Sequence, residues 1–380
     1  MRLNPVLDGL ATYPFVRLAQ ARSAAAARGV KIIDLGAGEP REPTPAFVRR
    51  ALVEALDGEP ISAYPLAEGL GELREAIAGW CARRFGTPLD PDRGVVPTYG
   101  SKEAIFHLAQ VVCAHGDRVA VTTPGYPVPA RGALFAGAQV LELGLDAAHG
   151  WLPDLDAVDW DGVSLLWLNF PNNPTAVVAP LALYERAAAL AREHDFVLAC
   201  DEAYSELWFG GDPPVSALQV ADHTNVVVFN TLSKRSSMPG YRIGFAAGDP
   251  QIIAALKRYR PNVGTAPQAF VQRAAAAAWG EETHVEDVRA RYAAKRDVLL
   301  PALRAAGLQP TGGDATFFLW LATPGGQDAE AYALRLLDER GIVVAPGPFF
   351  GPGGEGHVRV ALVATLEDCR RAADLLASGP

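Results

Sequence analysis

Residues 229–245 read FNTLSKRSSMPGYRIGF and run from an apolar, β-rich segment into a turn that contains Ser, Pro and Gly. Lys234 stands where the predicted strand ends, with Ser233 before it and Arg242 eight positions later. Lysines usually lie on exposed surfaces, where their charge stays hydrated. A lysine directly after an apolar strand therefore indicates a role in the chemistry of an active site.

Similar apolar runs precede this stretch and alternate with helical patterns. Residues 180–194, PLALYERAAALAREH, have the apolar spacing of a helix and are rich in Ala, Leu and Glu. Strands that alternate with helices form βαβ crossovers and a buried, mostly parallel sheet. We therefore expect a large α/β domain at residues 45–279, with strands at residues 117–124, 138–145, 163–170, 195–202 and 225–232.

The pattern changes after the alanine-rich helix predicted at residues 272–279. A long charged helix is predicted at residues 281–307, and new strands follow at residues 316–323 and 356–363. We expect residues 280–380 to form a smaller α+β domain, with residues 1–44 packed near it as an N-terminal arm.

Composition argues against several classes of partner. The 380-residue chain has a formal net charge of −9 and no run of five Lys or Arg residues, so neither a nucleic acid nor an anionic membrane is expected. The N-terminus has no apolar signal core, and no apolar run approaches the roughly 20 residues that span a bilayer. We expect a soluble, cytoplasmic protein that acts on small molecules. No metal site or disulfide framework is indicated, because no CxxC pair occurs among Cys81, Cys113, Cys200 and Cys369.

Polar residues follow three of the predicted strands at the point where each strand ends. Ligands of an open parallel sheet bind beyond the carboxyl ends of its strands, so we expect these residues to converge on one crevice. Taken singly, each has an ordinary explanation as a turn residue, a helix cap or a surface charge. They are Asn172 and Asn173 in LNFPNNPTA, Asp201 and Tyr204 in CDEAY, and Thr231, Ser233 and Lys234 in NTLSK.

Residues 97–112, PTYGSKEAIFHLAQVV, predict a Gly-Ser turn that opens a helix. The backbone N–H groups of Gly100, Ser101 and Lys102 can converge there on an anion at the positive end of the helix dipole. The alternative is an ordinary helix start that Ser101 caps.

Two residues that flank Lys234 can contact the same anion. Thr231 can supply a hydroxyl group and Arg242 a charge-assisted donor. A phosphate held in this way, beside a lysine able to form a Schiff base, a buried carboxylate and phenol or amide donors, describes pyridoxal 5'-phosphate.

With these features the chain resembles the class I/II aminotransferases of the aspartate aminotransferase fold, also called fold type I. The resemblance implies a PLP-dependent aminotransferase with a mostly parallel seven-stranded sheet in its large domain. It also implies a homodimer that moves an amino group between an amino acid and a 2-oxo acid, with glutamate and 2-oxoglutarate as the expected pair. The matching motifs, in order, are GEPREPTP, YPLAEGLGELREAI, GSKEAI, PGYPV, PNNPT, DEAY, SKRSSMPGYRIG and HVRVALVAT, from residue 38 to residue 365.

The resemblance implies a role for each matching residue. Lys234 is implied to form the Schiff base and then to move the α-proton, while Asp201 pairs with the ring nitrogen and Tyr204 donates to the phenolic oxygen. The charge of Asp201 would keep that nitrogen protonated, so that the ring can act as an electron sink. The implied substrate-binding residues are Gly38, Asn173 and Arg359. The implied cofactor-binding residues are Tyr64 from the partner subunit, Gly100, Ser101, Lys102, Tyr126, Asn173, Asp201, Tyr204, Thr231, Ser233, Lys234 and Arg242.

Three stretches resemble the succinyldiaminopimelate aminotransferases of bacterial lysine synthesis. They are GEPREPTP, residues 229–249 and residues 343–362. A substrate with a second carboxylate needs a further cation, and Lys102, Arg260 and Arg41 are the candidates.

Two alternatives to this substrate assignment remain, and a third alternative is not an enzyme. The chain can be an aminotransferase for aspartate, alanine or aromatic acids, or a carbon-sulfur lyase on the same fold. A transcription regulator would need an N-terminal DNA-binding module, and LAQARSAAAARG lacks the basic recognition helix expected there.

Overall fold

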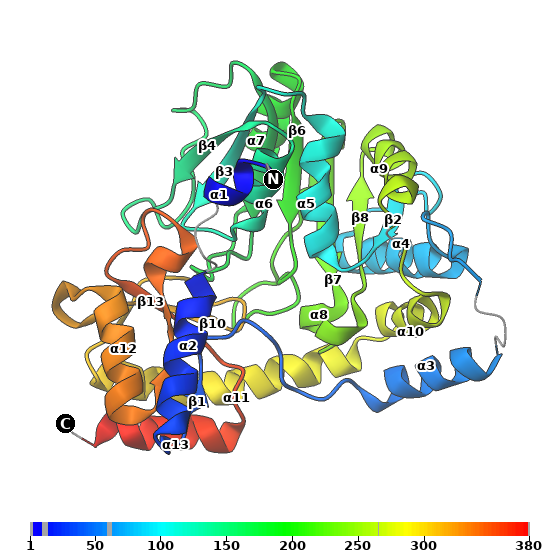
Figure 1. Ribbon diagram of the computed structural model, residues 1–380. Helices are drawn as coiled ribbons and strands as arrows, with labels where there is room; N and C mark the ends of the chain where they lie inside the picture. Colours follow the sequence, from blue (N-terminus) through cyan, green and yellow to red (C-terminus); the bar gives the residue numbers. More distant parts are fainter. Residues whose placement is uncertain (1–2, 10–13, 59–62, 265, 379–380) are drawn as a thin grey trace.

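A seven-stranded sheet forms the centre of the larger layer of the molecule (Figure 1). The computed structural model describes residues 3–9, 14–58, 63–264 and 266–378. All neighbouring strands pair in parallel except β8, which runs antiparallel to both of its neighbours. The prediction of a mostly parallel, seven-stranded sheet is confirmed. In spatial order the strands are β2 (Val95–Thr98), β8 (Gly244–Gly248), β7 (Val226–Thr231), β6 (Val197–Asp201), β5 (Val163–Asn169), β3 (Arg118–Thr123) and β4 (Gln139–Gly144).

The five strands predicted from apolar runs are all present, as β3 to β7. Their residues alternate between two cores, one on each face of the sheet. In β3, for example, Val119 and Val121 enter one core while Ala120 enters the other. Because both faces are covered, β3, β5, β6 and β7 are mostly apolar, whereas β4, at the edge of the sheet, also carries exposed polar residues.

Helices cover both faces of this sheet. One core contains residues of α5 (Ser101–Val112), α6 (Val128–Phe135) and α9 (Pro250–Val263). The opposite core contains residues of α3 (Ala46–Gly58), α4 (Gly71–Phe85), α7 (Leu181–Glu193) and α10 (Ala269–Trp279). The helices predicted at residues 180–194 and 272–279 correspond to α7 and α10.

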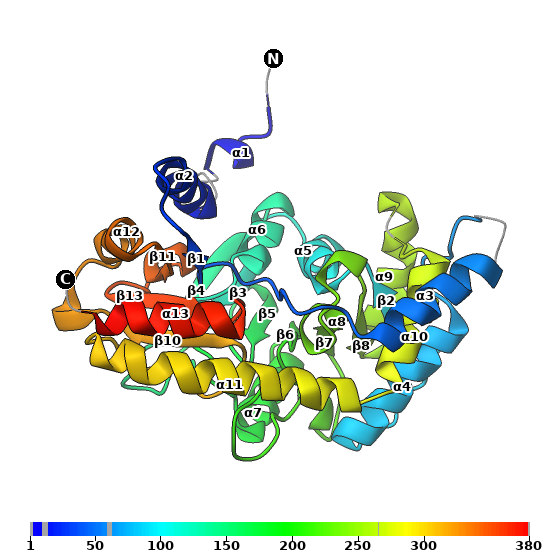
Figure 2. The ribbon, with the colours of Figure 1, turned by 90° about the horizontal axis from the view of Figure 1, so that it is seen from below.

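The long helix α11 (Thr283–Ala305) connects α10 to a second group of elements, which pack around β10 and β13 and are called the second layer below. Figure 2 shows α11 running beside α13 (Leu366–Ala377). The strands predicted there are present as β10 (Phe318–Ala322) and β13 (His357–Ala361), which pair antiparallel. Apart from the single-turn helix α8 (Leu232–Arg235) and short 3-10 helices, the other described elements are α1 (Val6–Gly9), α2 (Pro14–Ala27), β1 (Ile33–Asp34), β9 (Gln309–Pro310), α12 (Ala329–Arg340), β11 (Ile342–Val343) and β12 (Ala345–Pro346).

The second layer has a hydrophobic core of its own. Ile33 and Leu35 from the N-terminal part of the chain pack there with residues from α11, β10, α12, β13 and α13. The parallel pair β1 and β11 joins the N-terminal segment to this layer. The division of the chain into residues 45–279 and residues 1–44 with 280–380 stays a prediction.

None of the described helices has the length and apolar character required to cross a membrane. Within the same described residues, no cluster of three or more His, Cys, Asp or Glu side chains could hold a metal ion.

Candidate active site

A cavity of about 440 Å³ lies where β5, β6 and β7 end, and residues of the second layer line its other side. The chain thus places the carboxyl ends of three parallel strands around one space, as the sequence predicted. The predicted site residues that line it are Gly38, Ser101, Lys102, Tyr126, Asn173, Asp201, Tyr204, Thr231, Ser233, Lys234, Arg242 and Arg359.

Lys234 lies in the single-turn helix α8 (Leu232–Arg235), directly after β7. Its Nζ donates to the backbone oxygen of Gly38 at 2.9 Å and lies 5.7 Å from the centre of the Tyr204 ring. Burial lowers the pKa of Lys234 to about 8, the Arg359 guanidinium adds to this effect, and nearby carboxylates oppose it. A substantial fraction of this amine is therefore neutral near pH 8, as a proton acceptor requires.

Asp201 is the last residue of β6 and is buried beside Lys234. Its Oδ1 accepts from the backbone N–H of Ala203 at 3.2 Å. Burial raises the pKa of Asp201 to about 6, while the Ala203 bond and the Lys234 charge act in the opposite direction. The carboxyl group is therefore ionised at neutral pH and can face a cation.

Tyr204 is buried with its ring against Phe317 and Phe318. Burial raises the pKa of its hydroxyl above the ordinary value. The phenol therefore keeps its proton at neutral pH and can donate a hydrogen bond into the cavity.

The turn between β2 and α5 begins the helix with Gly100 at a φ of 71° as the N-cap, without a capping side chain. The alternative in which Ser101 caps the helix is wrong, because Ser101 is the first helical residue. A Cβ atom on Gly100 would lie 2.5 Å from Nη2 of Arg242, so only glycine allows this guanidinium to approach the turn.

Hydroxyl groups and a guanidinium gather next to this turn. Thr231 Oγ1 donates to Ser233 Oγ at 2.9 Å, and Arg242 Nη1 donates to the backbone oxygen of Pro239 at 2.9 Å. Lys102 lies among them, and burial together with Arg131 and Arg242 lowers its pKa. This set of hydroxyls, cations and a helix N-terminus suits a phosphate group.

Arg359 extends from β13 into the opposite side of the cavity and is 2% exposed. Its Nη1 donates to Asn173 Oδ1 at 2.7 Å and its Nη2 to the backbone oxygen of Gly36 at 2.8 Å. The guanidinium carbon lies 4.1 Å from the ring centre of Phe318 and 4.6 Å from that of Phe350. Two aromatic rings thus hold a planar donor pair that matches a carboxylate.

The cavity also contains residues that the sequence patterns did not single out. Asn169, at the end of β5, donates through Nδ2 to the backbone oxygen of Asp201 at 2.9 Å. Its position at the end of a strand, like that of Asp201, could have identified it as a site residue from the sequence. Phe318, Phe350 and Glu39 gave no such signal, because each reaches the cavity from the second layer or the segment before α3.

Besides Gly100 and Tyr64, three residues named from the sequence do not line this cavity. Arg260 is buried and binds the carboxylate of Glu103, and Arg41 donates to Asp34 Oδ2 at 2.8 Å. Both guanidinium groups are thus engaged by carboxylates of their own chain and neither lines this cavity, so binding of a distal substrate group by either stays a prediction. Asn172 is also buried, and its Oδ1 accepts from the backbone and hydroxyl of Thr175 within the turn.

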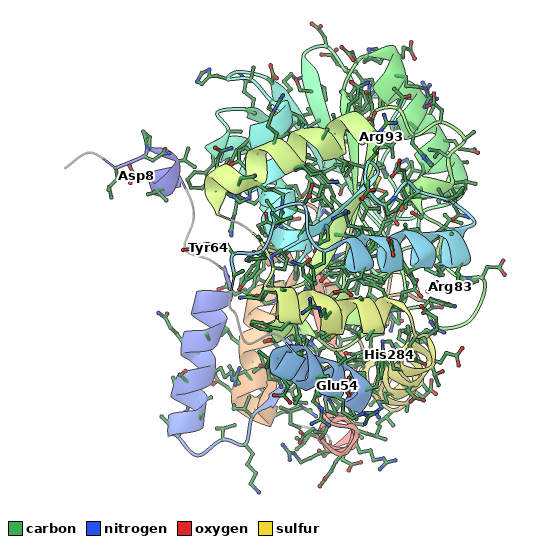
Figure 3. The ribbon with its side chains drawn as sticks, turned by 90° about the vertical axis from the view of Figure 1, so that its right-hand side faces the viewer. Asp8, Glu54, Tyr64, Arg83, Arg93 and His284 are labelled. Carbon is green, nitrogen blue, oxygen red and sulfur yellow. The ribbon has the colours of Figure 1, made fainter. Side chains whose placement is uncertain are left out.

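Tyr64 lies apart from the cavity of its own chain and is fully exposed (Figure 3). Its side chain therefore contributes nothing to the site of the single chain described here.

The sequence description of the family "Aminotransferase class I and II" matches residues 30–376 of this chain. The chain belongs to the class I and II aminotransferases. Members of this family use pyridoxal 5'-phosphate, so this protein is a PLP-dependent aminotransferase of fold type I.

Similar proteins match this aminotransferase over nearly its whole length. It is 37% identical to an LL-diaminopimelate aminotransferase of Dehalococcoides mccartyi, over all of this chain and 99% of that protein. A structure from Thermus thermophilus, described as a "probable N-succinyldiaminopimelate aminotransferase", is 33% identical with a TM-score of 0.89, over 96% of this chain and 99% of that chain. A single mutant of the T. thermophilus aspartate aminotransferase is 32% identical with a TM-score of 0.91, over 99% of each chain.

The residues present in the cavity of this aminotransferase fit that cofactor. The absence of a side chain at Gly100 lets the Arg242 guanidinium lie against the turn, next to hydroxyl groups and a helix N-terminus, as a phosphate group requires. Asp201, a buried carboxylate, and Lys234, a largely buried amine, also line the cavity.

Proposed function

We propose that this aminotransferase exchanges an amino group between LL-diaminopimelate and 2-oxoglutarate, in the diaminopimelate route of lysine biosynthesis. The observation that carries the amino-transfer chemistry is the placement of Lys234, Asp201 and Arg359 around one cavity. The relatives named as LL-diaminopimelate aminotransferases, at 36–37% identity over nearly the full chain, support the substrate.

Lys234 is proposed as the residue that moves the α-proton. When bound, the pyridine ring of the cofactor supplies an electron sink for the carbon that loses this proton. The lowered pKa of Lys234 leaves part of its amine neutral, so it can accept a proton and return it. Asp201 would hold the ring nitrogen protonated through its charge, and Tyr204 and Asn173 would donate to the phenolic oxygen.

The phosphate is proposed to bind at the N-terminus of α5. Its ligands would be the backbone N–H groups after Gly100, the hydroxyls of Ser101, Thr231 and Ser233, and the side chains of Lys102 and Arg242. Tyr126, which borders the cavity at the start of α6, is proposed to stack on the ring.

The substrate α-carboxylate is proposed to bind Arg359, beside Gly38 and Asn173. A Cβ atom on Gly38 would lie 3.4 Å from Nη2 of Arg359 and 3.2 Å from the Phe318 ring, so glycine at this position leaves room for the carboxylate. Lysine could not replace Arg359, because it lacks the paired donors.

The far end of LL-diaminopimelate carries one ammonium and one carboxylate. Among the described residues that line the cavity, apart from those proposed for the phosphate, Glu39 is the charged one that is exposed, and its carboxylate can pair with that ammonium. An N-succinyl derivative has no free ammonium at that end and would leave Glu39 without a partner. We therefore propose the free diamino acid as substrate, although the sequence motifs alone favoured the succinyl derivative.

We expect kcat/KM for LL-diaminopimelate to exceed that for N-succinyl-LL-diaminopimelate, aspartate, alanine or phenylalanine by about tenfold, equivalent to ~1.4 kcal/mol of transition-state binding. The measurement is each amino donor with 2-oxoglutarate under one set of conditions. Glu39→Gln should reduce the preference for LL-diaminopimelate over its succinyl derivative, whereas Glu185→Gln, at an exposed position of α7, should not. A higher kcat/KM for aspartate or phenylalanine would refute the substrate while leaving the aminotransferase assignment intact.

We also propose a homodimer in which Tyr64 of each protomer donates to the phosphate in the partner's cavity. Support comes from the full exposure of Tyr64 and from the exposed apolar side chains of Val53, Leu56 and Leu66 in the same part of the chain. Two-fold symmetry would then create two equal sites.

Sedimentation velocity is expected to give a dimer, and Tyr64→Phe is expected to weaken PLP binding about tenfold through loss of one charge-assisted hydrogen bond. Tyr332→Phe, in α12 of the second layer, is the matched control and should leave PLP binding unchanged. A fully active monomer would refute the shared site.

A further inference from the structure

Arg260 and Glu103 form a largely buried ion pair next to the turn that we assign to the cofactor phosphate. Arg260 lies in the last turn of α9 and is 1% exposed. Its Nη1 donates to both carboxylate oxygens of Glu103, at 2.7 Å and 3.0 Å. Glu103 is the third residue of α5, next to Lys102, so this pair joins α9 to the first turn of the phosphate-binding helix.

We infer that Arg260 is a positioning residue for the phosphate-binding turn and acts on it through the carboxylate of Glu103. This inference rests on the proposed assignment of Gly100, Ser101 and Lys102 to the phosphate.

Glu103 holds the peptide that leads into this turn. Its Oε2 accepts from the backbone N–H of Tyr99 at 3.1 Å, while the backbone oxygen of Tyr99 accepts from Nη2 of Arg242 at 3.5 Å. Tyr99 is therefore held at both ends of its backbone, immediately before Gly100. If the Glu103 carboxylate rotated away, the Tyr99 N–H would lose its acceptor and the turn would lose its fixed orientation.

The charge of Glu103 requires neutralisation. Burial acts to raise the pKa of Glu103, but hydrogen bonds from His107, Arg260 and the Tyr99 N–H outweigh it, so the carboxyl pKa lies below its ordinary value and the group is ionised. An ionised carboxylate in the first turn of α5 repels a phosphate bound at the same helix end. Arg260 neutralises this charge. His107 is a weaker partner, because its Nδ1 lies 3.5 Å from Oε1 of Glu103.

An electrostatic role and a purely structural role predict different cofactor selectivity. If Arg260 only stabilises the fold, its loss weakens every ligand of the cavity alike. If it compensates Glu103 beside the phosphate, its loss weakens pyridoxal 5'-phosphate far more than pyridoxal, which lacks the phosphate. Removing the carboxylate charge as well should then restore binding.

The test is equilibrium binding of PLP and of pyridoxal to the full-length protein after cofactor removal, followed by absorbance. Arg260→Met is expected to raise the Kd for PLP about 30-fold, the order expected for one uncompensated charge near a dianion in a partly buried site. The Kd for pyridoxal should change by less than about threefold. Adding Glu103→Gln to Arg260→Met should bring the PLP Kd back to within about fivefold of the original protein.

Arg258→Met is the matched control, because Arg258 lies on the same helix and is exposed, and it should change neither Kd. If Arg260→Met alone fails to fold by circular dichroism, the double variant, which leaves no charge unpaired, is compared with Glu103→Gln alone. The double variant is then expected to bind PLP at least about fivefold more weakly than Glu103→Gln, because the Arg260 cation that remains unopposed in Glu103→Gln attracts the phosphate dianion.

Equal losses for PLP and pyridoxal, or no recovery on adding Glu103→Gln, would overturn the positioning role. In the comparison of the two Glu103 variants, equal PLP affinities would do the same. A Ser101→Ala variant with unchanged PLP affinity would overturn the phosphate assignment and this inference with it. A selective loss of PLP binding in Ser101→Ala without one in Arg260→Met would overturn the inference alone. No amino acid is present in these measurements, so the outcome is independent of the proposed substrate.

Discussion

Lys234→Ala is expected to lower kcat by about 10⁴-fold or more, because the variant lacks the amine that is proposed both to bind the cofactor and to move the α-proton. The side chain that is lost donates to the backbone oxygen of Gly38. Among the described residues that line the cavity, the other lysine is Lys102, which lies in α5 and not after β7. PLP binding should persist, because the proposed phosphate contacts come from α5, Thr231, Ser233 and Arg242. The measurement is single-turnover conversion of an amino acid, together with the Kd for PLP.

Lys257→Ala provides the control for this loss. Lys257 is a partly buried lysine of α9 whose Nζ donates to the backbone oxygen of Asp92, outside the cavity. This variant should retain turnover within about twofold. Near-normal turnover in Lys234→Ala would show that the proposed role of Lys234 is wrong.

Asp201→Asn is expected to keep the cofactor bound and to slow α-proton removal by about 10²- to 10³-fold, since a neutral amide cannot hold the ring nitrogen protonated. Asp201 is buried, and its pKa of about 6 leaves it ionised at neutral pH. Because an amide has nearly the same shape as a carboxyl group, the change tests charge more than packing.

The measurement is exchange of the substrate α-proton with deuterium, followed by NMR. Asp249→Asn is the matched control, because Asp249 is an equally buried aspartate that caps α9 by accepting from the Gln251 N–H, and asparagine is also a good cap. An exchange rate in Asp201→Asn equal to that of Asp249→Asn would contradict the proposed role of the charge.

Much of the large sheet could be predicted from local patterns. The apolar runs of β3, β5, β6 and β7 are long enough to identify, because both faces of these strands are largely buried, whereas the edge strand β4 shows a weaker apolar pattern. The strands β2 and β8 were not marked individually. The four residues of β2 include a proline and β8 contains two glycines, so neither has a strong β-strand pattern.

The candidate site could also be predicted from the sequence, for a different reason. Lys234, Asp201 and Asn173 follow the carboxyl ends of strands, and parallel strands bring those ends to one edge of the sheet. The order of the strands was therefore enough to predict a shared cavity. Arg359 could be recognised only through the resemblance of HVRVALVAT to the family, because nothing in its local pattern indicates which layer it faces.

The sequence alone thus determined the residue types at the strand ends and the alternation of strands with helices, since both depend on neighbours a few positions apart. The tertiary structure alone decided the partners of long, charged side chains. Arg260 was a candidate for the substrate until the fold placed it against Glu103, 157 positions away, and Arg41 until it met Asp34. A guanidinium on a flexible stem can reach several acids, and its choice depends on burial and on distances across the folded chain, which local spacing does not encode.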